Sequence, residues 1–136
     1  MTEKKEISLP SRIESVDEAA IEAEKFVRSL GLDDGLVSAV DLAVRESVAN
    51  AVKHGNVFDE KKNVEIAFVN SPEEFQITVR DFGKGFDPDE IPDPTNPDNL
   101  LKANGRGILF MRSFMDEVFW KKHDEGGMIV TMKKQH

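Results

Sequence analysis

The sequence predicts an α+β protein, a two-layer α/β sandwich in which helices cover a mixed, mostly antiparallel sheet. Two observations support this prediction. Apolar residues recur at helical spacing in two segments before residue 56, and beyond residue 61 they alternate with polar residues at a period of two. Helices grouped in this way pack on one face of a mostly antiparallel sheet. The length of 136 residues, near the usual size of a domain, predicts one domain over residues 1–136.

A short strand and a helix are expected at the start of the chain. Residues 5–9 alternate weakly and precede a proline, which permits only an edge or terminal position in a sheet. The helix is expected over residues 17–30, with Ser15 or Asp17 as its N-terminal cap. Gly31 then ends it.

The second helix is the segment around which the rest of the chain is organised. It is expected to begin at Asp33 or Asp34 and to continue through His54. Gly55 and Asn56 end it, because this pair suits a left-handed conformation. Such an ending explains Gly55 without a functional role. One side of the helix is apolar and should face the core: Val37, Val40, Val44, Val48 and Ala51.

Two antiparallel hairpins supply the other strands. The first alternates apolar and polar residues on both sides of a turn at residues 70–72 and ends at Asp81. Its inward positions are Val64, Ile66, Phe68, Phe75, Ile77 and Val79. The second hairpin pairs residues 117–122 with residues 128–133 around two adjacent glycines.

The segment between the two hairpins differs in character from the rest of the chain. Residues 82–104 contain four of the six prolines, together with many Asp and Asn residues, which predicts a loop. A loop of this length inside a small domain is often a functional lid, and we expect a lid at about residues 86–104. A helix should follow it over residues 105–115.

Charge and composition exclude several classes of function. With 26 acidic and 18 basic residues, the formal charge of −8 repels phosphate backbones, so nucleic acid is not an expected partner. The chain has no cysteine, which excludes disulfides, thiolate metal sites and a cysteine nucleophile. We expect a cytoplasmic protein without membrane contact, since neither a signal peptide nor a span of about 20 apolar residues is found.

Three polar residues of the second helix form the first candidate site. Glu46, Asn50 and Lys53 fall on the side opposite the apolar one and are bordered by small residues, Ala39 and Ala49. That side could form the floor of a pocket. The alternative is an ordinary solvated helix face.

Glycine-containing motifs form the second candidate site. Asp81, Gly83 and Gly85 follow a strand, and Gly105 and Gly107 precede a helix. Either set could be a simple turn or a helix entry. Together they bracket the loop, and the free amides of a helix N-terminus favour a phosphate. A carboxylate at position 81 would accept a hydrogen bond from an amino group, as on adenine.

Several enzyme classes lack their signatures here. Residues 81–83 spell the DFG of eukaryotic-type protein kinases, but the chain has no HRD loop, no VAIK strand and too few residues for two lobes. No Walker motif occurs. His54 and His123 lack companions at metal-ligand spacing, which disfavours a zinc hydrolase.

Three motifs in order resemble the ATPase superfamily of gyrase, heat-shock chaperones, mismatch-repair proteins and sensor histidine kinases. They are ExxxNAxKHG at residues 46–55, DFGKGFD at residues 81–87 and GRGILFMRSFMDEV at residues 105–118. Within this superfamily of histidine-kinase-like ATPase domains, they resemble the free-standing anti-sigma factor serine kinases. The resemblance covers about residues 5–133.

The resemblance implies a role for each candidate residue. Glu46 would be the general base, Asn50 would hold Mg²⁺ through its side-chain oxygen, Lys53 would approach a phosphate of ATP, and Asp81 would bind adenine. Gly83 and Gly85 would let the backbone approach the base and ribose. Gly105, Arg106 and Gly107 would close on the phosphates. Mg²⁺ prefers oxygen ligands and usually bridges protein to phosphate, which agrees with a single amide ligand.

The resemblance also implies an activity and partners. We expect an ATP-dependent serine kinase that phosphorylates an anti-anti-sigma (STAS-type) protein, sequesters a sigma factor and forms a homodimer. No helix pair that could carry a phosphoacceptor histidine is expected before Asp17, so the target should be another protein. The alternatives are a nucleotide-sensing module that switches partners without transferring phosphate, and a simple ATPase.

Overall fold

The structure is a computed structural model that describes residues 2–83 and 113–136. In chain order, the elements of this part are β1 (Glu3–Pro10), α1 (Glu14–Ser29), α2 (Asp34–Asn50), a π-helical turn η1 (Ala51–Gly55), β2 (Asn63–Asn70), β3 (Glu74–Arg80), β4 (Glu117–Lys122) and β5 (Met128–Gln135).

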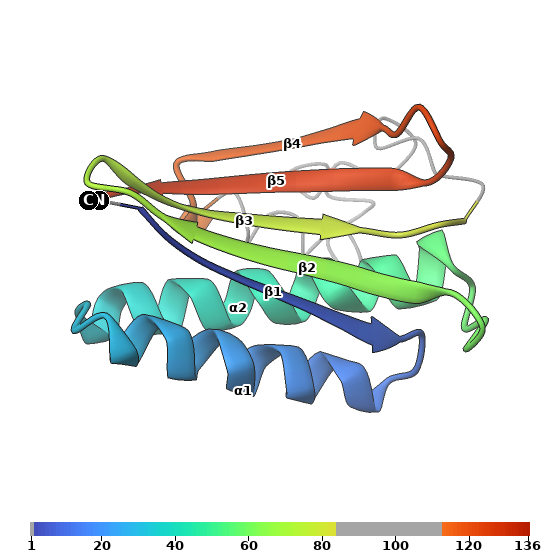
Figure 1. The fold of residues 1–136 in the computed structure, drawn as a ribbon, viewed down its shortest axis with the longest axis horizontal. Coiled ribbons are helices and arrows are strands. Elements are labelled where there is room, and N and C mark those ends of the chain that lie inside the picture. Colours follow the sequence, from blue (N-terminus) through green and yellow to red (C-terminus); the bar gives the residue numbers. More distant parts are fainter. Residues whose placement is uncertain (1, 84–112) are drawn as a thin grey trace, which may run out of the picture.

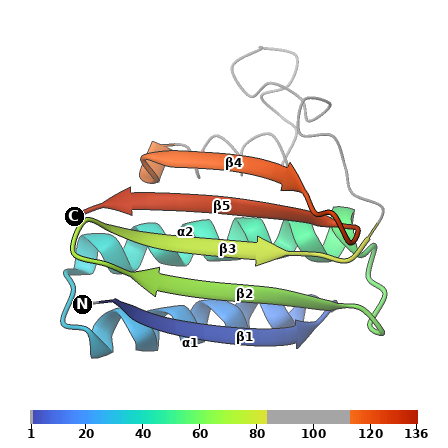
Figure 2. The ribbon, with the colours of Figure 1, turned by 45° about the horizontal axis from the view of Figure 1, so that its top comes forward.

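The strands form one sheet in the order β1-β2-β3-β5-β4, and all four pairings are antiparallel. Helices α1 and α2 lie side by side on one face of this sheet (Figures 1 and 2). The predicted two-layer α+β sandwich is therefore confirmed. The first strand lies at an edge, as its proline indicated, although it is longer than residues 5–9.

The core lies between the helices and the sheet. On α2, the predicted apolar side is buried, and Val40, Val44 and Val48 are each at most 1% exposed. Burial of one such side chain contributes about 1.5–3 kcal/mol to folding. Phe26 of α1 joins the same core, where its ring stacks on Phe68 of β2 with 6.1 Å between centroids.

The register of the sheet aligns one row of inward-facing residues across all five strands. Each member pairs with the next one: Ile7, Ile66, Val79, Val130 and Trp120. Because side chains alternate between the faces of a strand, this row lies on the side that the helices cover. Its last three members come from β3, β5 and β4 and line a pocket, described below.

The start of α1 differs from the prediction. The helix begins at Glu14, and neither Ser15 nor Asp17 caps it, because Ile13 occupies the cap position without a side-chain hydrogen bond. Ser15 Oγ instead donates to the carbonyl of Pro10 at 2.6 Å. Within this turn, backbone carbonyls accept from the amides that follow, so a side-chain cap is not needed. The predicted end is confirmed, since Gly31 has a φ of 70°.

The end of α2 also differs from the prediction. Asp33 caps its start by accepting from the Leu36 amide at 2.8 Å, as expected. The α-helix stops at Asn50, however, and the chain continues as the π-turn η1, in which the Asn56 amide donates to the carbonyl of Ala51 at 2.8 Å. The left-handed conformation predicted for Gly55 and Asn56 is wrong. Asn56 has a φ of −85°, and positive φ angles occur at the next two residues, Val57 and Phe58.

The second half of the chain is described only in part. The second hairpin is confirmed, with β4 at its predicted bounds and β5 two residues longer than expected. The lid at residues 86–104 and most of the helix at residues 105–115 lie outside the described residues.

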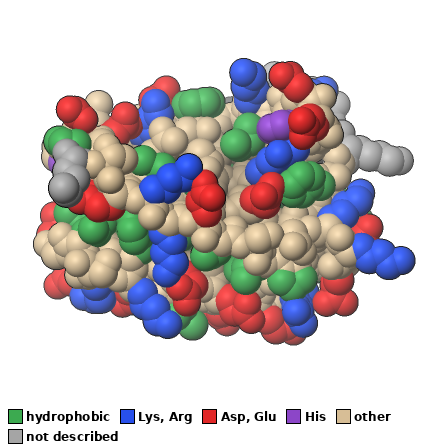
Figure 3. Space-filling model, in the orientation of Figure 1, with side chains coloured by type: hydrophobic (Ala, Val, Ile, Leu, Met, Phe, Trp, Pro, Cys, Tyr) green, Lys and Arg blue, Asp and Glu red, His purple; other side chains and the backbone are tan. Residues whose placement is uncertain are grey.

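The surface carries charges of both signs. Acidic and basic side chains are interspersed on the face shown in Figure 3, with apolar side chains between them. Among residues 2–83 and 113–136, no helix is long and apolar enough to cross a membrane.

Candidate functional site

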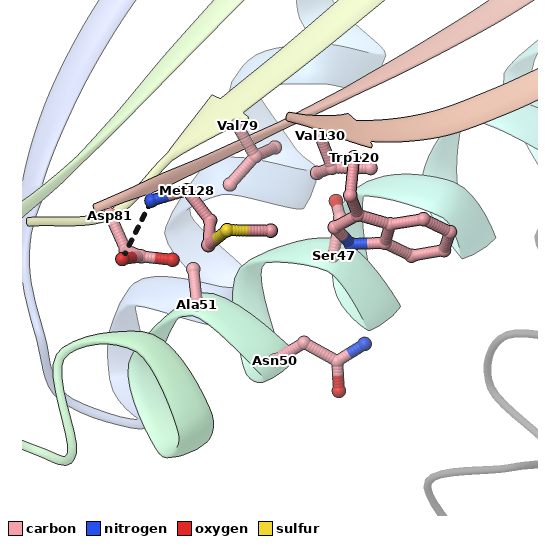
Figure 4. A pocket seen from close by; sticks show the side chains of 8 residues that line it. All are labelled: Ser47, Asn50, Ala51, Val79, Asp81, Trp120, Met128 and Val130. Atoms are coloured by element: carbon pink, nitrogen blue, oxygen red, sulfur yellow. Dashed lines mark hydrogen bonds between the residues drawn. The ribbon is translucent and has the colours of Figure 1, made fainter. Parts of the chain in front are cut away.

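A pocket lies between the C-terminal half of α2 and the sheet (Figure 4). It contains about 270 Å³ of empty space, its open mouth included. Helix α2 and η1 supply one wall, and strands β3, β5 and β4 supply the other. The lining residues are Ser47, Asn50, Ala51, Val79, Asp81, Trp120, Met128 and Val130.

Asp81 is the buried acidic residue of this pocket, only 2% exposed. It follows the last residue of β3, and its amide donates to the carbonyl of Met128 on β5 at 3.0 Å. Its Oδ1 accepts from the amides of Gly83 at 3.1 Å and of Met128 at 3.3 Å. The backbone therefore holds Oδ1, and no hydrogen bond between described residues involves Oδ2.

The pKa of Asp81 reflects two opposing effects. Burial raises it above the ordinary value, because an ionised carboxylate loses hydration in the pocket. The two backbone amides that donate to Oδ1 oppose this shift, since they stabilise the ionised form. A carboxylate held in this way is suited to accept a hydrogen bond from a ligand.

Three glycines pack tightly around Asp81. A Cβ atom on Gly55 would lie 2.3 Å from Oδ2 of Asp81, and one on Gly83 would lie 1.7 Å from the carbonyl oxygen of Gly55. A Cβ on Gly127 would lie 2.0 Å from the carbonyl oxygen of Asp81. The interpretation of Gly55 as merely a helix end is therefore wrong, because a side chain there would displace the buried carboxylate.

The polar residues of the second helix lie at different depths. Asn50 is 6% exposed and lines the pocket, whereas Glu46 is half-buried and Lys53 is exposed. In Figure 4, Asn50 and Asp81 lie on opposite sides of Ala51. Burial raises the pKa of Glu46, and the positive charge of Lys53 partly offsets this rise. A raised pKa brings a carboxylate closer to the range in which a general base works.

The side chains of the pocket suit a hard cation such as Mg²⁺ only if a bound ligand supplies further oxygen atoms. No group of three or more His, Asp or Glu side chains among the described residues could hold a metal ion. Asn50 lines the pocket, and Mg²⁺ accepts one side-chain amide oxygen when phosphates and water complete its shell. The residues present therefore fit Mg²⁺ bound together with a nucleotide.

Several predicted site residues cannot be placed. Gly85, Gly105, Arg106 and Gly107 lie outside the described residues, as does the lid. Conversely, several residues that line the pocket were not among the predicted site residues, including Ser47, Trp120 and Met128. Trp120 could have been found, because it lies at an inward position of an alternating strand. Met128 contributes its backbone amide, which no side-chain pattern indicates.

Comparison with known proteins relates this chain to a family and to a known fold. The description "Histidine kinase-like ATPase domain" applies to the family whose model matches residues 9–134. The Clostridium perfringens protein named anti-sigma F factor is 31% identical over all of this chain and 99% of its own length. Serine-protein kinase RsbW of Oceanobacillus iheyensis is 25% identical, over 95% of this chain and 84% of its own length.

A solved structure has the same fold. It contains the RsbU and RsbW domains of a Mycobacterium tuberculosis protein, and it matches 97% of this chain with a TM-score of 0.71 at 19% identity. The present chain spans 32% of that longer chain. The family match over residues 9–134 and the full-length relatives lead to one conclusion: this chain belongs to the family of histidine kinase-like ATPase domains.

Proposed function

We propose that the protein is a cytoplasmic, ATP-dependent serine kinase of the anti-sigma type, which phosphorylates an anti-anti-sigma (STAS-type) protein. The observation that carries this proposal is the arrangement of Asp81, which has one carboxylate oxygen fixed by two backbone amides and shares a pocket with Asn50. ATP, bound with Mg²⁺, would supply the phosphoryl group and the charge that stabilises its transfer.

Asp81 would select the base of the nucleotide. Its ionised carboxylate accepts hydrogen bonds, and adenine presents an amino group where guanine presents a carbonyl oxygen. In a buried pocket, an acceptor facing another acceptor leaves both groups unpaired, which is costly. Asp81 would therefore favour adenine nucleotides over guanine nucleotides.

Glu46, Asn50 and Lys53 would act at the phosphate end of the same nucleotide. Asn50 would ligate Mg²⁺ through its amide oxygen, and Lys53 would approach a phosphate. Glu46 would accept the proton of the attacking serine hydroxyl, a role for which burial has raised its pKa. Contacts from Gly83, Gly85, Gly105, Arg106 and Gly107 to the base, ribose and phosphates belong to the same proposal.

The names of the relatives support this choice of reaction and partners. One relative is named a serine-protein kinase and several are named anti-sigma F factors, at 25–31% identity. By analogy, the present protein would hold a sigma factor, release it when the anti-anti-sigma protein binds, and work as a homodimer. Glu46 is present, which favours a kinase over a module that only senses nucleotide.

Two measurements test the proposal. Calorimetry should detect binding of Mg·ATP, and Trp120, the single tryptophan of the chain, should report the same event by fluorescence because it lines the pocket. Partners are then captured with ADP or ATP present, purified and incubated with Mg·ATP, and phosphosites are mapped by mass spectrometry. The proposal expects phosphoserine on a captured partner.

The same experiment separates the alternatives. Phosphate release with no labelled partner would identify a simple ATPase. Binding of a partner that depends on the nucleotide, with no phosphate transfer, would identify the nucleotide-sensing module. Absence of ATP binding would reject all three functions.

A further inference from the structure

The side chain of Asn56 lies in a buried hydrogen-bond network next to the pocket. It is 2% exposed, and Ser11, its neighbour in the network, is fully buried. The amide nitrogen Nδ2 donates to Ser11 Oγ at 2.7 Å and to the carbonyl of Asn63 at 3.1 Å. The oxygen Oδ1 accepts from the backbone amide of Phe82 at 2.7 Å. Asn56 does stand at the helix end, as the sequence predicts, but its side chain has this further role.

The chemistry of the partners fixes the orientation of this amide group. The carbonyl of Asn63 can only accept a hydrogen bond, so it must face Nδ2, and the amide of Phe82 can only donate, so it must face Oδ1. Ser11 is compatible with this orientation, because its hydroxyl accepts a hydrogen bond from Asn56 Nδ2 and donates one to the carbonyl of Lys62. Rotation of the Asn56 amide by 180° would break two of these contacts.

Asn56 occupies the place of a missing contact between two strands. Glu65 of β2 pairs with Arg80 of β3, so continuation of that register would bring Asn63 opposite Phe82. The two strands do not pair there. The side-chain amide of Asn56 stands between them instead, and it bonds the carbonyl of Asn63 on one side and the amide of Phe82 on the other.

This bridge supports Asp81 from the side opposite β5. The amide of Asp81 and its Oδ1 both bond Met128 of β5, which fixes the residue on that side. The next amide, that of Phe82, has Asn56 as its partner. Since Gly55 precedes Asn56 and packs against the Asp81 carboxyl group, the bridge also fixes the distance between η1 and that group.

We propose that Asn56 is a positioning residue for base recognition: by bridging Asn63 and Phe82, it holds Asp81 where the carboxylate can accept from adenine. This inference rests on the proposed function, because it assumes that Asp81 binds the base. Asn56 itself does not contact the nucleotide, and it lies away from Glu46. Its loss should therefore affect nucleotide affinity and base selectivity, and leave the chemical step nearly unchanged.

Three variants test the role of Asn56. Asn56→Ala removes the bridge, and Asn56→Asp keeps the acceptor for the Phe82 amide but cannot donate to Asn63. Val27→Ala is the matched control, because Val27 is fully buried in α1, outside the pocket, and its truncation lowers stability alone. For each protein, affinities for ATP and GTP are measured by calorimetry well below the unfolding temperature, and KM and kcat are measured with the purified partner.

The positioning role gives a distinct pattern of results. Asn56→Ala should raise the Kd and KM for ATP about tenfold, the order expected for one lost hydrogen bond, and should lower ATP-over-GTP selectivity by the same factor. Its kcat at saturating ATP should stay within about twofold of wild type. Asn56→Asp keeps the contact to Phe82 but loses the one to Asn63, so it should lose less ATP-over-GTP selectivity than Asn56→Ala. Val27→Ala should be less stable yet keep wild-type selectivity. Hydrogen exchange of the Phe82 amide should be fast only in Asn56→Ala.

Other outcomes would overturn the inference. Wild-type selectivity in folded Asn56→Ala would mean that Asn56 acts on stability alone, and equal losses in Asn56→Ala and Val27→Ala would mean the same. If Asn56→Ala does not fold, Asn56→Ser replaces it, because a serine hydroxyl is too short to bridge both partners. A wild-type protein that does not distinguish ATP from GTP would instead reject the proposed role of Asp81.

Discussion

A glycine stands near the end of α1 and another at the end of η1, which continues α2, but the two glycines serve different purposes. Gly31 follows α1 with a φ of 70°, and a Cβ atom there would meet nothing within 4 Å. Gly55 ends η1 without a positive φ, and a Cβ atom there would lie 2.3 Å from the Asp81 carboxyl group. The first glycine is needed for its backbone conformation and the second for the space it leaves. A helix-ending glycine in a sequence therefore does not reveal which of the two reasons applies.

The polar sides of the two helices also differ in what surrounds them. Polar residues of α1 form ion pairs at the surface, such as Arg28 with Glu24 and Lys5 with Glu22. On α2, Asn50 lines the pocket and Glu46 is half-buried. We infer that α1 supports the fold while α2 carries the chemistry, and the following substitutions test this division.

The largest effect is expected from Glu46→Gln. This change keeps the shape of the side chain but removes the general base, so phosphorylation of the partner should fall by roughly 10²- to 10⁴-fold while ATP still binds. Glu24→Gln on α1 is the matched control and should leave the transfer rate unchanged. A phosphotransfer assay with purified partner decides the matter: undiminished transfer by the Glu46 variant would place the base elsewhere.

Gly55→Ala should have the next largest effect. The added methyl group must displace the Asp81 carboxyl group, and overpacking of this kind costs about 1–3 kcal/mol of stability. ATP binding should weaken as well, because the base-binding carboxylate moves. Gly31→Ala should cost about 1–2 kcal/mol through its left-handed backbone and leave ATP binding intact. Denaturant unfolding and calorimetry compare the two variants, and equal ATP affinities would remove the distinction between these glycines.

Asp81→Asn should weaken adenine nucleotides by about 1–3 kcal/mol, since the amide loses the charge that accepts the amino group. Affinity for guanine nucleotides should change much less. Calorimetric titration with ATP and GTP measures both quantities. Unchanged affinities for both nucleotides would show that Asp81 does not read the base.

The smallest effect is expected in the pH dependence of the free energy of unfolding, to which Glu46 contributes. Burial raises the folded-state pKa of Glu46 above its ordinary value of 4.5, so folding disfavours the ionised carboxylate. The folded protein therefore binds more protons than the unfolded chain, and this group lowers stability as pH rises from 4.5 through the raised value. Urea unfolding from about pH 4 to pH 7 should show a shallower decline for Glu46→Gln than for wild type. Parallel curves would mean that Glu46 titrates normally.

Much of the fold was predictable because the residues that build it obey local rules. The buried valines of α2 and the alternating residues of β2, β3 and β5 follow the helical and extended periods over enough positions to be unambiguous. Asp33 was recognisable as a cap because its carboxylate bonds an amide three residues away. The start of α1 was not, because its capping bonds come from backbone carbonyls, which every residue has.

The site was predictable only where side chains carry it. Asp81 and Asn50 belong to recognisable motifs, and the structure brings them into one pocket. The space that Gly55 leaves and the bridge that Asn56 forms depend on partners 26 residues away along the chain. No local pattern contains such a contact, and only the folded structure reveals it.

The π-turn η1 has a consequence for how helix positions are counted in this protein. A π-turn places one more residue in a turn than an α-helix does, so every residue after Ala51 is rotated by about 100° from its place on an ideal helical wheel. Asn56 reaches the end of β3 because of this phase shift. If residues 51–55 wound as an ordinary α-helix instead, Asn56 would be turned away from Phe82, although every side chain of the site would still be present.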